Sequence, residues 1–404
     1  MDVKERDTCR VSNGPLLEVL DLGELPFSCF PQADEELPAK LPLQLCLNAV
    51  SGLVQLKHTV DPDAMYSQYW YMSGVNQSMK NALRSIVEQA VARSRISLSR
   101  GDVVVDIASN DGTLLSAYPE ELYRVGIDPA KNIKPKSCDL HINTYFSAEA
   151  YQRELGDKKA KIVTSIAMFY DLEDPIRFAT DVAAILDQQG LWIIELSYLP
   201  TMLEINSFDT ICSEHLEYYS LMSLEYILSQ SGMEVEDVEL NDINGGSFRV
   251  YVRHKGFAQE TSAVKKMREN EKLLNLTAVD TYKKFSERVE KNKREMLAFL
   301  KDQIGLGKKV IGYGASTKGN TIMAYYGIGS DLVSHVADRN PIKWGRKTVT
   351  GIPIISEEQA REMKPDYFLA FPYHFMREFL SREEAFINRG GRFISPIPRL
   401  TLLP

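Results

Sequence analysis

The sequence predicts an α/β protein with a small β-rich N-terminal domain, a central doubly wound domain and a C-terminal Rossmann-like domain. Its 404 residues are too many for one ordinary hydrophobic core. Apolar runs of strand length alternate with helical stretches in the centre of the chain, and the alternation returns after Lys308. Such alternation is typical of parallel sheets covered by helices. The expected domains are residues 1–65, 66–256 and 257–404.

The first two domains differ in their apolar pattern. Residues 1–65 are rich in proline, leucine and turn-forming residues, with short strand-like pieces such as "SGLVQLKH". A helix is then predicted at "NQSMKNALRSIVEQAVARS", followed by strands at "DVVVDIA", "YRVGID", "AKIVTSIA" and "GLWIIELS". The stretch "PIRFATDVAAILDQQ" predicts a helix that ends at Gly190, and "GSFRVYVRHKG" predicts a late edge strand.

The last domain begins with a helical bridge. Residues 257–304 contain no proline and no strand signal, and their apolar residues recur at helical spacing, which predicts one or two long helices packed on neighbouring domains. Strands are then predicted at "KVIGYGA", "LVSHVAD", "YFLAFP" and "RFISPIP". This second alternating unit predicts a Rossmann-like domain.

Composition excludes some classes of partner. The net charge of −8 gives no support for nucleic-acid or anionic-membrane binding, because both favour a basic surface. No apolar run approaches the roughly 20 residues that span a bilayer, and "MDVKERDTCR" does not resemble a secretory leader. The five cysteines are scattered and odd in number, so we expect a reduced, cytoplasmic protein. The oligomeric state is left open.

The stretch "VVVDIASNDGTLL" predicts a cofactor-binding turn between a strand and a helix. An acidic residue, Asp128, ends the next strand and can accept hydrogen bonds from two ribose hydroxyls. The turn lacks the full G-x-G-x-x-G that admits a pyrophosphate, and its acidic residues suit a cationic, phosphate-free cofactor. We therefore predict an S-adenosylmethionine site in a methyltransferase domain, formed by Asp106, Ala108, Asn110, Asp111, Gly112 and Asp128.

A second glycine turn, "VIGYGASTKGNT", predicts a phosphate site. Glycines let the backbone approach a phosphate, and a helix start supplies N–H donors. A lysine at a helix start opposes the helix dipole unless an anion offsets it. The predicted diphosphate ligands are Gly314, Ser316, Thr317, Lys318 and Asn320.

A nicotinamide-dependent oxidoreductase is the alternative interpretation of the second turn. It rests on Gly312-x-Gly314 after one strand and on Asp338 at the end of the next. Four residues separate Gly314 from Gly319, which departs from the dinucleotide spacing. A non-catalytic carbohydrate-binding or scaffold protein is a third interpretation.

Several motifs together resemble one family over nearly the whole chain. They are "SGLVQL", "YMSGVNQSM", "DIASNDGTLL", "AMFYDLEDP", "FDTICSEHLEYYSL", "NDINGGSFRVYV", "GYGASTKGNT" and "PYHFMREFL". The chain resembles the three-domain C-methyltransferases that act on nucleotide-linked 4-keto-deoxysugars. The resemblance implies a zinc-binding N-terminal domain and a nucleotide-linked keto-sugar held between the other two domains.

The chain departs from the family's two C-x-x-C pairs. Ser12 stands three residues after Cys9, in the place of the second cysteine of the first pair. Asn48 and Ser51 stand in the places of the second pair. Serine and asparagine are poor zinc ligands, so we predict no bound metal. A site rebuilt from Cys29, Cys46 and His58 is the alternative.

The implied chemistry is methylation of a ring carbon, C3 by expectation, next to the ketone of a 4-keto-6-deoxyhexose. Such a reaction needs a base for the α-proton and a hydrogen bond to the enolate oxygen. The resemblance assigns His215 and Glu214 of "CSEHLEYY" to the active site, with His215 as general base, and matches Tyr71 to an active-site tyrosine. We expect the segment from Ala167 to Asp171 to lie beside the sulfonium of the cofactor. Ala167 and Phe169 are the expected cofactor contacts. Cys212 replaces a tyrosine found in several relatives, and is interpreted as a small buried thiol.

Overall fold

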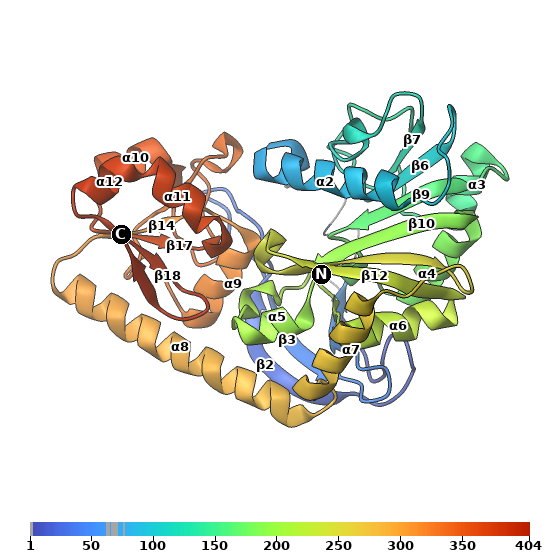
Figure 1. Cartoon of the computed structure of the whole chain (residues 1–404). Coiled ribbons are helices and arrows are strands. Elements are labelled where there is room, and N and C mark those ends of the chain that lie inside the picture. The colour runs from blue at the N-terminus through green and yellow to red at the C-terminus, as the bar shows by residue number, and fades with distance from the viewer. Residues whose placement is uncertain (1–2, 62–64, 66–71, 76) are drawn as a thin grey trace.

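The protein has three lobes that meet at its centre (Figure 1). The computed structural model describes residues 3–61, 65, 72–75 and 77–404. The lobe of the seven-stranded sheet and the lobe of the C-terminal sheet lie side by side, and strands of the N-terminal sheet lie below and between them. This arrangement agrees with the predicted α/β class and with a β-rich N-terminus.

The central sheet has seven strands in the order β12-β13-β10-β9-β6-β7-β8. The five strands from β10 to β8 are parallel, and β13 and β12 add to β10 in antiparallel fashion. Parallel strands covered on both faces need continuous apolar runs, and every residue of β6 is buried. The bounds are β6 Val103–Ile107, β7 Tyr123–Ile127, β8 Leu140–Ile142, β9 Ala160–Ile166, β10 Leu186–Ser197, β12 Met233–Asn241 and β13 Ser247–His254.

Helices cover this sheet, and two details of the prediction were wrong. The helices are α2 Gln77–Arg93, α3 Ala148–Leu155, α4 Pro175–Ile185 and α6 Leu221–Gln230, whereas α5 Leu199–Glu204 packs into the core that joins the N-terminal strands to the C-terminal sheet. Helix α4 ends at Ile185 rather than at Gly190, which lies within β10 just before its pairing with β9 resumes. Strand β13 lies inside the sheet between β10 and β12, so β12 is the edge strand.

One strand of the N-terminal sheet comes from the central part of the chain. Its order is β11-β4-β3-β2, with β2 Leu17–Pro26, β3 Lys40–Leu47, β4 Val54–Leu56 and β11 Glu217–Tyr218. A two-stranded sheet pairs β1 Val3–Glu5 with β5 His58–Val60. Strand β11 begins two residues after His215, so the N-terminal sheet reaches the predicted catalytic segment.

The positions that carry zinc ligands in the resembling family form a hydrogen-bonded cluster here. The Asn48 side-chain oxygen accepts from the Ser12 hydroxyl at 3.0 Å and from the Ser51 hydroxyl at 2.9 Å. The Asn48 amide nitrogen donates to the Pro15 carbonyl at 2.9 Å, and the Cys9 sulfur lies 3.4 Å from the Ser51 hydroxyl. Hydrogen bonds of polar side chains therefore connect the same two loops that a zinc ion would connect.

The bridge and the C-terminal lobe follow the predicted pattern. The bridge consists of α7 Ser262–Leu274 and α8 Val279–Gly305, and α8 runs along one side of the molecule to the C-terminal lobe (Figure 1). A six-stranded sheet follows in the order β16-β15-β14-β17-β18-β19, of which only the β18–β19 pair is antiparallel. Its strands are β14 Val310–Tyr313, β15 Val336–Asp338, β16 Ile354–Ser356, β17 Tyr367–Ala370, β18 Arg392–Ser395 and β19 Thr401–Leu403. Its helices are α9 Thr317–Tyr326, α10 Glu357–Glu362, α11 Met376–Arg382 and α12 Glu384–Asn388.

The hydrophobic cores cross the predicted domain boundaries. One cluster of buried residues joins strands β2, β3 and β4 with α8, α9 and the C-terminal sheet. A second cluster fills the central lobe and includes Cys9 and Leu53 from the N-terminal part. No helix in the described ranges is both long and apolar enough to cross a membrane.

We predict that the Asn48 cluster stabilises the N-terminal domain without a metal. The change Asn48→Ala leaves two hydroxyls and a carbonyl without their partner, which should lower the free energy of unfolding by about 2 kcal/mol or more. Thermal melting of the full chain measures this loss. The exposed Asn81→Ala serves as control and should melt like the wild type.

Metal analysis of the purified chain completes this test. Stoichiometric zinc in the wild type, lost in the Asn48→Ala protein, would contradict a metal-free cluster. An Asn48→Ala protein that melts like the wild type would show that the cluster contributes no stability.

Candidate functional site

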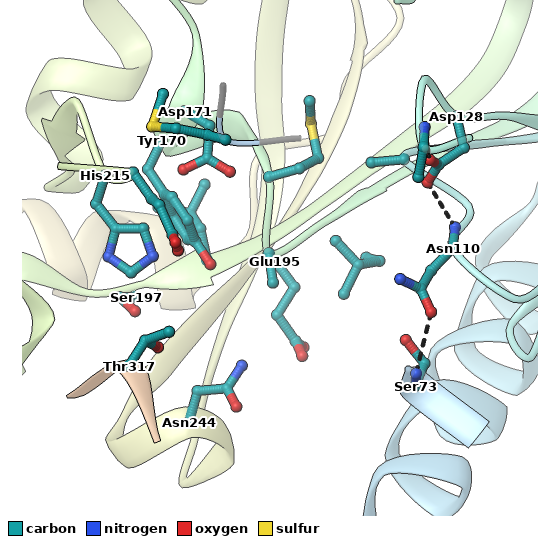
Figure 2. Close-up of a pocket in the computed structure, with 18 of the residues that line it drawn as sticks. Ser73, Asn110, Asp128, Tyr170, Asp171, Glu195, Ser197, His215, Asn244 and Thr317 are labelled. Atoms are coloured by element: carbon teal, nitrogen blue, oxygen red, sulfur yellow. Dashed lines mark hydrogen bonds between the residues drawn. The ribbon is translucent and has the colours of Figure 1, made fainter. Parts of the chain in front are cut away.

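A large cavity lies where the three lobes meet. It has a volume of about 550 Å³, which is within the range of ligand sites. Its walls come from the carboxyl ends of the central strands, from the start of α9 and from residues 27–30 of the N-terminal part. Figure 2 shows Asn110 and Asp128 on one side, His215 and Tyr170 on the other, and Glu195 between them. Both predicted turns therefore border one cavity.

The first turn is held open by unusual backbone conformations. Ala108 and Asn110 have φ of 58° and 50°, and Gly112 has φ of 78°. Non-glycine residues rarely adopt such angles, and they concentrate at functional sites. Asn110 accepts a hydrogen bond from the Ser73 amide at 3.1 Å, which connects the turn to the segment before α2. Ala108 and Asn110 both line the cavity, as predicted.

Asp128 lines the cavity at the end of β7. One carboxylate oxygen accepts from the Asn110 amide and the other from the Ala130 amide, both at 2.8 Å. A carboxylate has about four lone-pair sites, so each oxygen can still accept from a ribose hydroxyl. Asp128 thus holds the turn in place and presents acceptors at its surface.

Asp106 also lines the cavity, but its carboxyl is 4% exposed and accepts from the Thr164 hydroxyl at 2.6 Å. Burial raises the pKa of Asp106 to about 7, against the lowering effect of the Thr164 hydrogen bond, and nearby Asp128 raises it further. A cation beside this group favours its ionised form. The acidic lining therefore suits a positively charged cofactor.

Three other predicted cofactor contacts occupy different places. Asp111 and Gly112 do not line the cavity; the Asp111 carboxylate accepts from the Gly74 amide at 2.8 Å and from the Thr113 hydroxyl at 2.6 Å. Phe169 is fully buried and packs edge-on against Phe178 and Trp192. Its expected cofactor contact is therefore not supported, and Phe169 is a core residue behind the cavity.

Ala167 lies at the end of β9, where it lines the cavity with φ of 53°. Its amide donates to the Glu195 carbonyl at 2.7 Å, so the strand end is tied to β10. Tyr71 lies outside the described residues, and its predicted role stays a prediction.

His215 lines the cavity opposite the first turn. Its Nδ1 lies 2.7 Å from the Thr210 carbonyl oxygen, which can only accept. Nδ1 must therefore carry the ring proton, and Nε2 holds the free lone pair that a general base needs. The His215 ring also packs edge-on against Tyr170, with centroids 4.4 Å apart.

Glu214 lines the same wall, and Cys212 lies buried beside it. The ligand atoms of Cys212, Glu214 and His215 all lie within 4.8 Å of one another, a grouping that could hold a metal ion. Burial raises the pKa of Cys212 to about 12 and also raises the pKa of Glu214. A thiol must lose its proton to bind a metal, and the raised pKa of Cys212 opposes this, so the predicted absence of a metal stays our expectation.

The second turn contributes Ser316, Thr317 and Lys318 to the cavity. Ser316 caps α9 by accepting from the Gly319 amide at 3.0 Å. The first amides of a helix have no partner within it, which leaves the Thr317 and Lys318 N–H groups available. The Lys318 ammonium donates to the Asn244 carbonyl at 2.7 Å and forms no salt bridge with the described residues.

Gly314 and Asn320 do not line the cavity. A Cβ on Gly314 would lie 2.5 Å from Pro372, so close packing and a φ of 85° explain this glycine. Asn320 is 1% exposed and donates to the Cys29 carbonyl at 3.0 Å, which joins the C-terminal lobe to the N-terminal part. These two residues shape the turn and its surroundings.

The same turn does not support a dinucleotide. Asp338, which would hold a ribose, accepts from the Asn340 amide at 2.7 Å and is ion-paired with Lys343 at 3.5 Å. Lys343 also donates to the Ala315 carbonyl at 2.6 Å, in the turn itself. Lys343 thus already pairs with the Asp338 carboxylate, which a dinucleotide would need for its ribose.

Sequence reasoning missed Glu195 and Glu173 of the cavity wall. Glu195 is 3% exposed, and its carboxylate accepts from Arg249 at 2.7 Å and from Asn241 at 3.0 Å. Its place inside the apolar strand "GLWIIELS" was the available signal, because a charged residue there needs a buried partner. Asp171 was included in a lining segment, but not as a residue with a chemical role.

Comparison with known proteins agrees with the geometry. The family model described as "C-methyltransferase C-terminal domain" matches residues 242–398, and the "Methyltransferase domain" model matches residues 76–238. The chain is 32% identical to the C-methyltransferase NovU of Streptomyces niveus over 409 residues, which cover 98% of this chain and 96% of NovU.

Solved methyltransferase structures are similar to part of this chain. An S-adenosylmethionine-dependent methyltransferase from Clostridium acetobutylicum ATCC 824 is 10% identical and covers 44% of this chain and 92% of its own, with a TM-score of 0.32. Magnesium protoporphyrin IX methyltransferase of Synechocystis PCC 6803 with bound S-adenosylhomocysteine is 14% identical and covers 44% and 88%, with a TM-score of 0.33. The cofactor of this chain is S-adenosylmethionine.

We predict that Asp128→Ala weakens S-adenosylmethionine binding by about 2 kcal/mol or more, because hydrogen bonds to a charged acceptor are lost. Calorimetry measures the affinity. Asp128→Asn is the matched variant: it keeps the shape but offers one acceptor oxygen, so an intermediate loss is expected. Unchanged affinity in the alanine variant would remove Asp128 from the site.

Proposed function

Since the chain belongs to the C-methyltransferase family, we propose that it methylates a ring carbon next to the ketone of a nucleotide-linked 4-keto-6-deoxyhexose. C3 is the proposed carbon, and His215 is the proposed base. The observation that carries this proposal is the shared cavity, in which a base with a free Nε2 faces the cofactor turn. Bound S-adenosylmethionine supplies an electrophilic methyl group on a sulfonium.

The charges of the cavity are separated in a way that fits two different ligands. Asp106 and Asp128 line the side of the first turn, where a cationic cofactor is favoured. Lys318 lines the side of α9, and its charge has no carboxylate within salt-bridge distance among the described residues. A partly buried cation of this kind favours an anionic ligand such as a diphosphate, which the first amides of α9 would also bind.

His374 supports this division of charge. It lines the cavity near Lys318, and burial, together with the Lys318 charge, lowers the pKa of His374 to about 3. His374 is therefore neutral at working pH and adds no second positive charge. Lys318 remains the cation of this wall.

Product mass tests the proposed function. We predict that the protein, S-adenosylmethionine and a panel of nucleotide-linked 4-keto sugars yield a product heavier by one methylene unit. The change His215→Asn should lower turnover about 100-fold or more and leave S-adenosylmethionine affinity nearly unchanged, because only proton transfer is lost. Near-normal turnover in that variant would assign the base to another residue.

Steady-state kinetics test the proposed binding site for the diphosphate of the nucleotide sugar. We predict that Lys318→Ala raises KM for the nucleotide sugar more than it lowers kcat, and leaves S-adenosylmethionine affinity unchanged, since the lysine contacts the non-reacting diphosphate. Lys301→Ala, on the exposed face of α8, is the matched control and should behave like the wild type. A wild-type KM in the Lys318 variant would contradict the diphosphate site.

A further inference from the structure

A buried carboxyl group beside His215 has no function in the chemistry described so far. Asp171 is the last residue of the short helix η3, Phe169–Asp171, and lines the cavity. Its Oδ1 is buried and has no hydrogen-bond partner in the described structure. A buried polar atom without a hydrogen-bond partner is costly, so its presence at the wall of a binding cavity points to a ligand.

The backbone fixes where Asp171 lies relative to His215. The Leu216 amide donates to the Tyr170 carbonyl at 2.8 Å, so the peptide before Asp171 is hydrogen-bonded to the peptide after His215. The Tyr170 ring packs against the His215 ring in the same place. Figure 2 shows Asp171, Tyr170 and His215 together on one side of the cavity, with the cofactor turn on the other.

We propose that Asp171 donates the hydrogen bond that stabilises the enolate oxygen while His215 removes the α-proton. This inference rests on the proposed function. It assigns to Asp171 a substrate contact in place of the sulfonium contact expected from the sequence. The substrate ketone oxygen would accept this hydrogen bond from the Asp171 carboxyl at the cavity wall.

The surroundings of Asp171 favour the protonated form of its carboxyl, which can donate a hydrogen bond. Burial raises the pKa of Asp171 well above its ordinary value; the charge of His215 opposes this, and Glu214, Cys212 and Glu217 reinforce it. Tyr218 also faces this group, and its hydroxyl has no hydrogen-bond partner in the described structure. A neutral acid in a weakly solvated site is a stronger donor toward a developing oxyanion than a water molecule would be.

The reaction balances with these two residues. His215 Nε2 takes the α-proton, and the electron pair of that C–H bond forms the enolate, whose oxygen accepts from the Asp171 O–H. The enolate carbon then bonds to the methyl group, and the electron pair of the broken carbon–sulfur bond stays on sulfur. The ketone re-forms, Asp171 keeps its proton, and His215 releases the abstracted proton to solvent.

Two substitutions of similar size distinguish a donor from a base. Asp171→Asn keeps an N–H donor and cannot ionise, whereas Asp171→Leu has no donor. We predict that Asp171→Leu lowers kcat about 100-fold or more, the range found when one oxyanion donor is removed. Asp171→Asn should retain at least about tenfold more activity than Asp171→Leu. Asp157→Asn, on an exposed loop, is the matched control and should match the wild type.

The pH profile and an infrared measurement complete the test. An acid that must stay protonated loses its effect as pH rises through its raised pKa, so wild-type kcat should fall at high pH and Asp171→Asn should lack that fall. Infrared difference spectra between the wild type and Asp171→Asn at pH 7 should show a protonated carboxyl band. S-adenosylmethionine affinity, measured by calorimetry, should be equal in all variants and report intact folding.

Each contrary outcome has its own meaning. A wild type that methylates no member of the keto-sugar panel refutes the proposed function, and with it the role of Asp171. An active wild type refutes the role of Asp171 alone if the leucine variant stays fully active or if the asparagine and leucine variants are equally impaired. An ionised carboxylate band at pH 7 also overturns it.

Discussion

The candidate site depends on backbone hydrogen bonds that hold the segment around His215 from two sides. The Leu216 amide donates to Tyr170, and the Leu216 carbonyl accepts from the Leu56 amide, each at 2.8 Å. The next two residues form β11, which pairs with β4 of the N-terminal sheet. His215 is therefore fixed between the loop after β9 and a different domain. Catalysis needs such a rigid frame, because small displacements of a base have large effects on rate.

This constraint explains what the N-terminal domain contributes. Arg10 and Glu217 are fully buried and ion-paired at 3.4 Å, and Arg10 also donates to the Leu56 carbonyl at 2.7 Å. Breaking a buried pair by removing one partner is strongly destabilising, so this contact fastens β11 to the domain. The Asn48 cluster links the two loops of that domain. Residues 27–30 then complete the cavity wall. The domain is a support for the site as well as part of it.

From the sequence alone we could predict most strands and helices and, with the family resemblance, methyl transfer from S-adenosylmethionine. Alternating apolar runs have periods that only strands or helices satisfy, so both Rossmann-like units could be predicted from local patterns. Turn residues at strand ends identified Asp128, Asn110 and Ala108, because backbone geometry restricts which residues can stand there. His215 and Lys318 were also found, and both line the cavity. These signals are local, since each depends on neighbours in the chain.

Only the tertiary structure decided which side chains meet. The sequence placed Phe169 with the cofactor, but aromatic contacts from helix α4 and strand β10 enclose it in the core. It included Asp171 in a segment, but its proximity to His215 arises from one long-range hydrogen bond between backbone groups. It could not show that β11 completes the N-terminal sheet, because a two-residue strand has no periodicity. Burial, pairing and the tautomer of His215 depend on contacts between residues far apart in the chain, which no local pattern encodes.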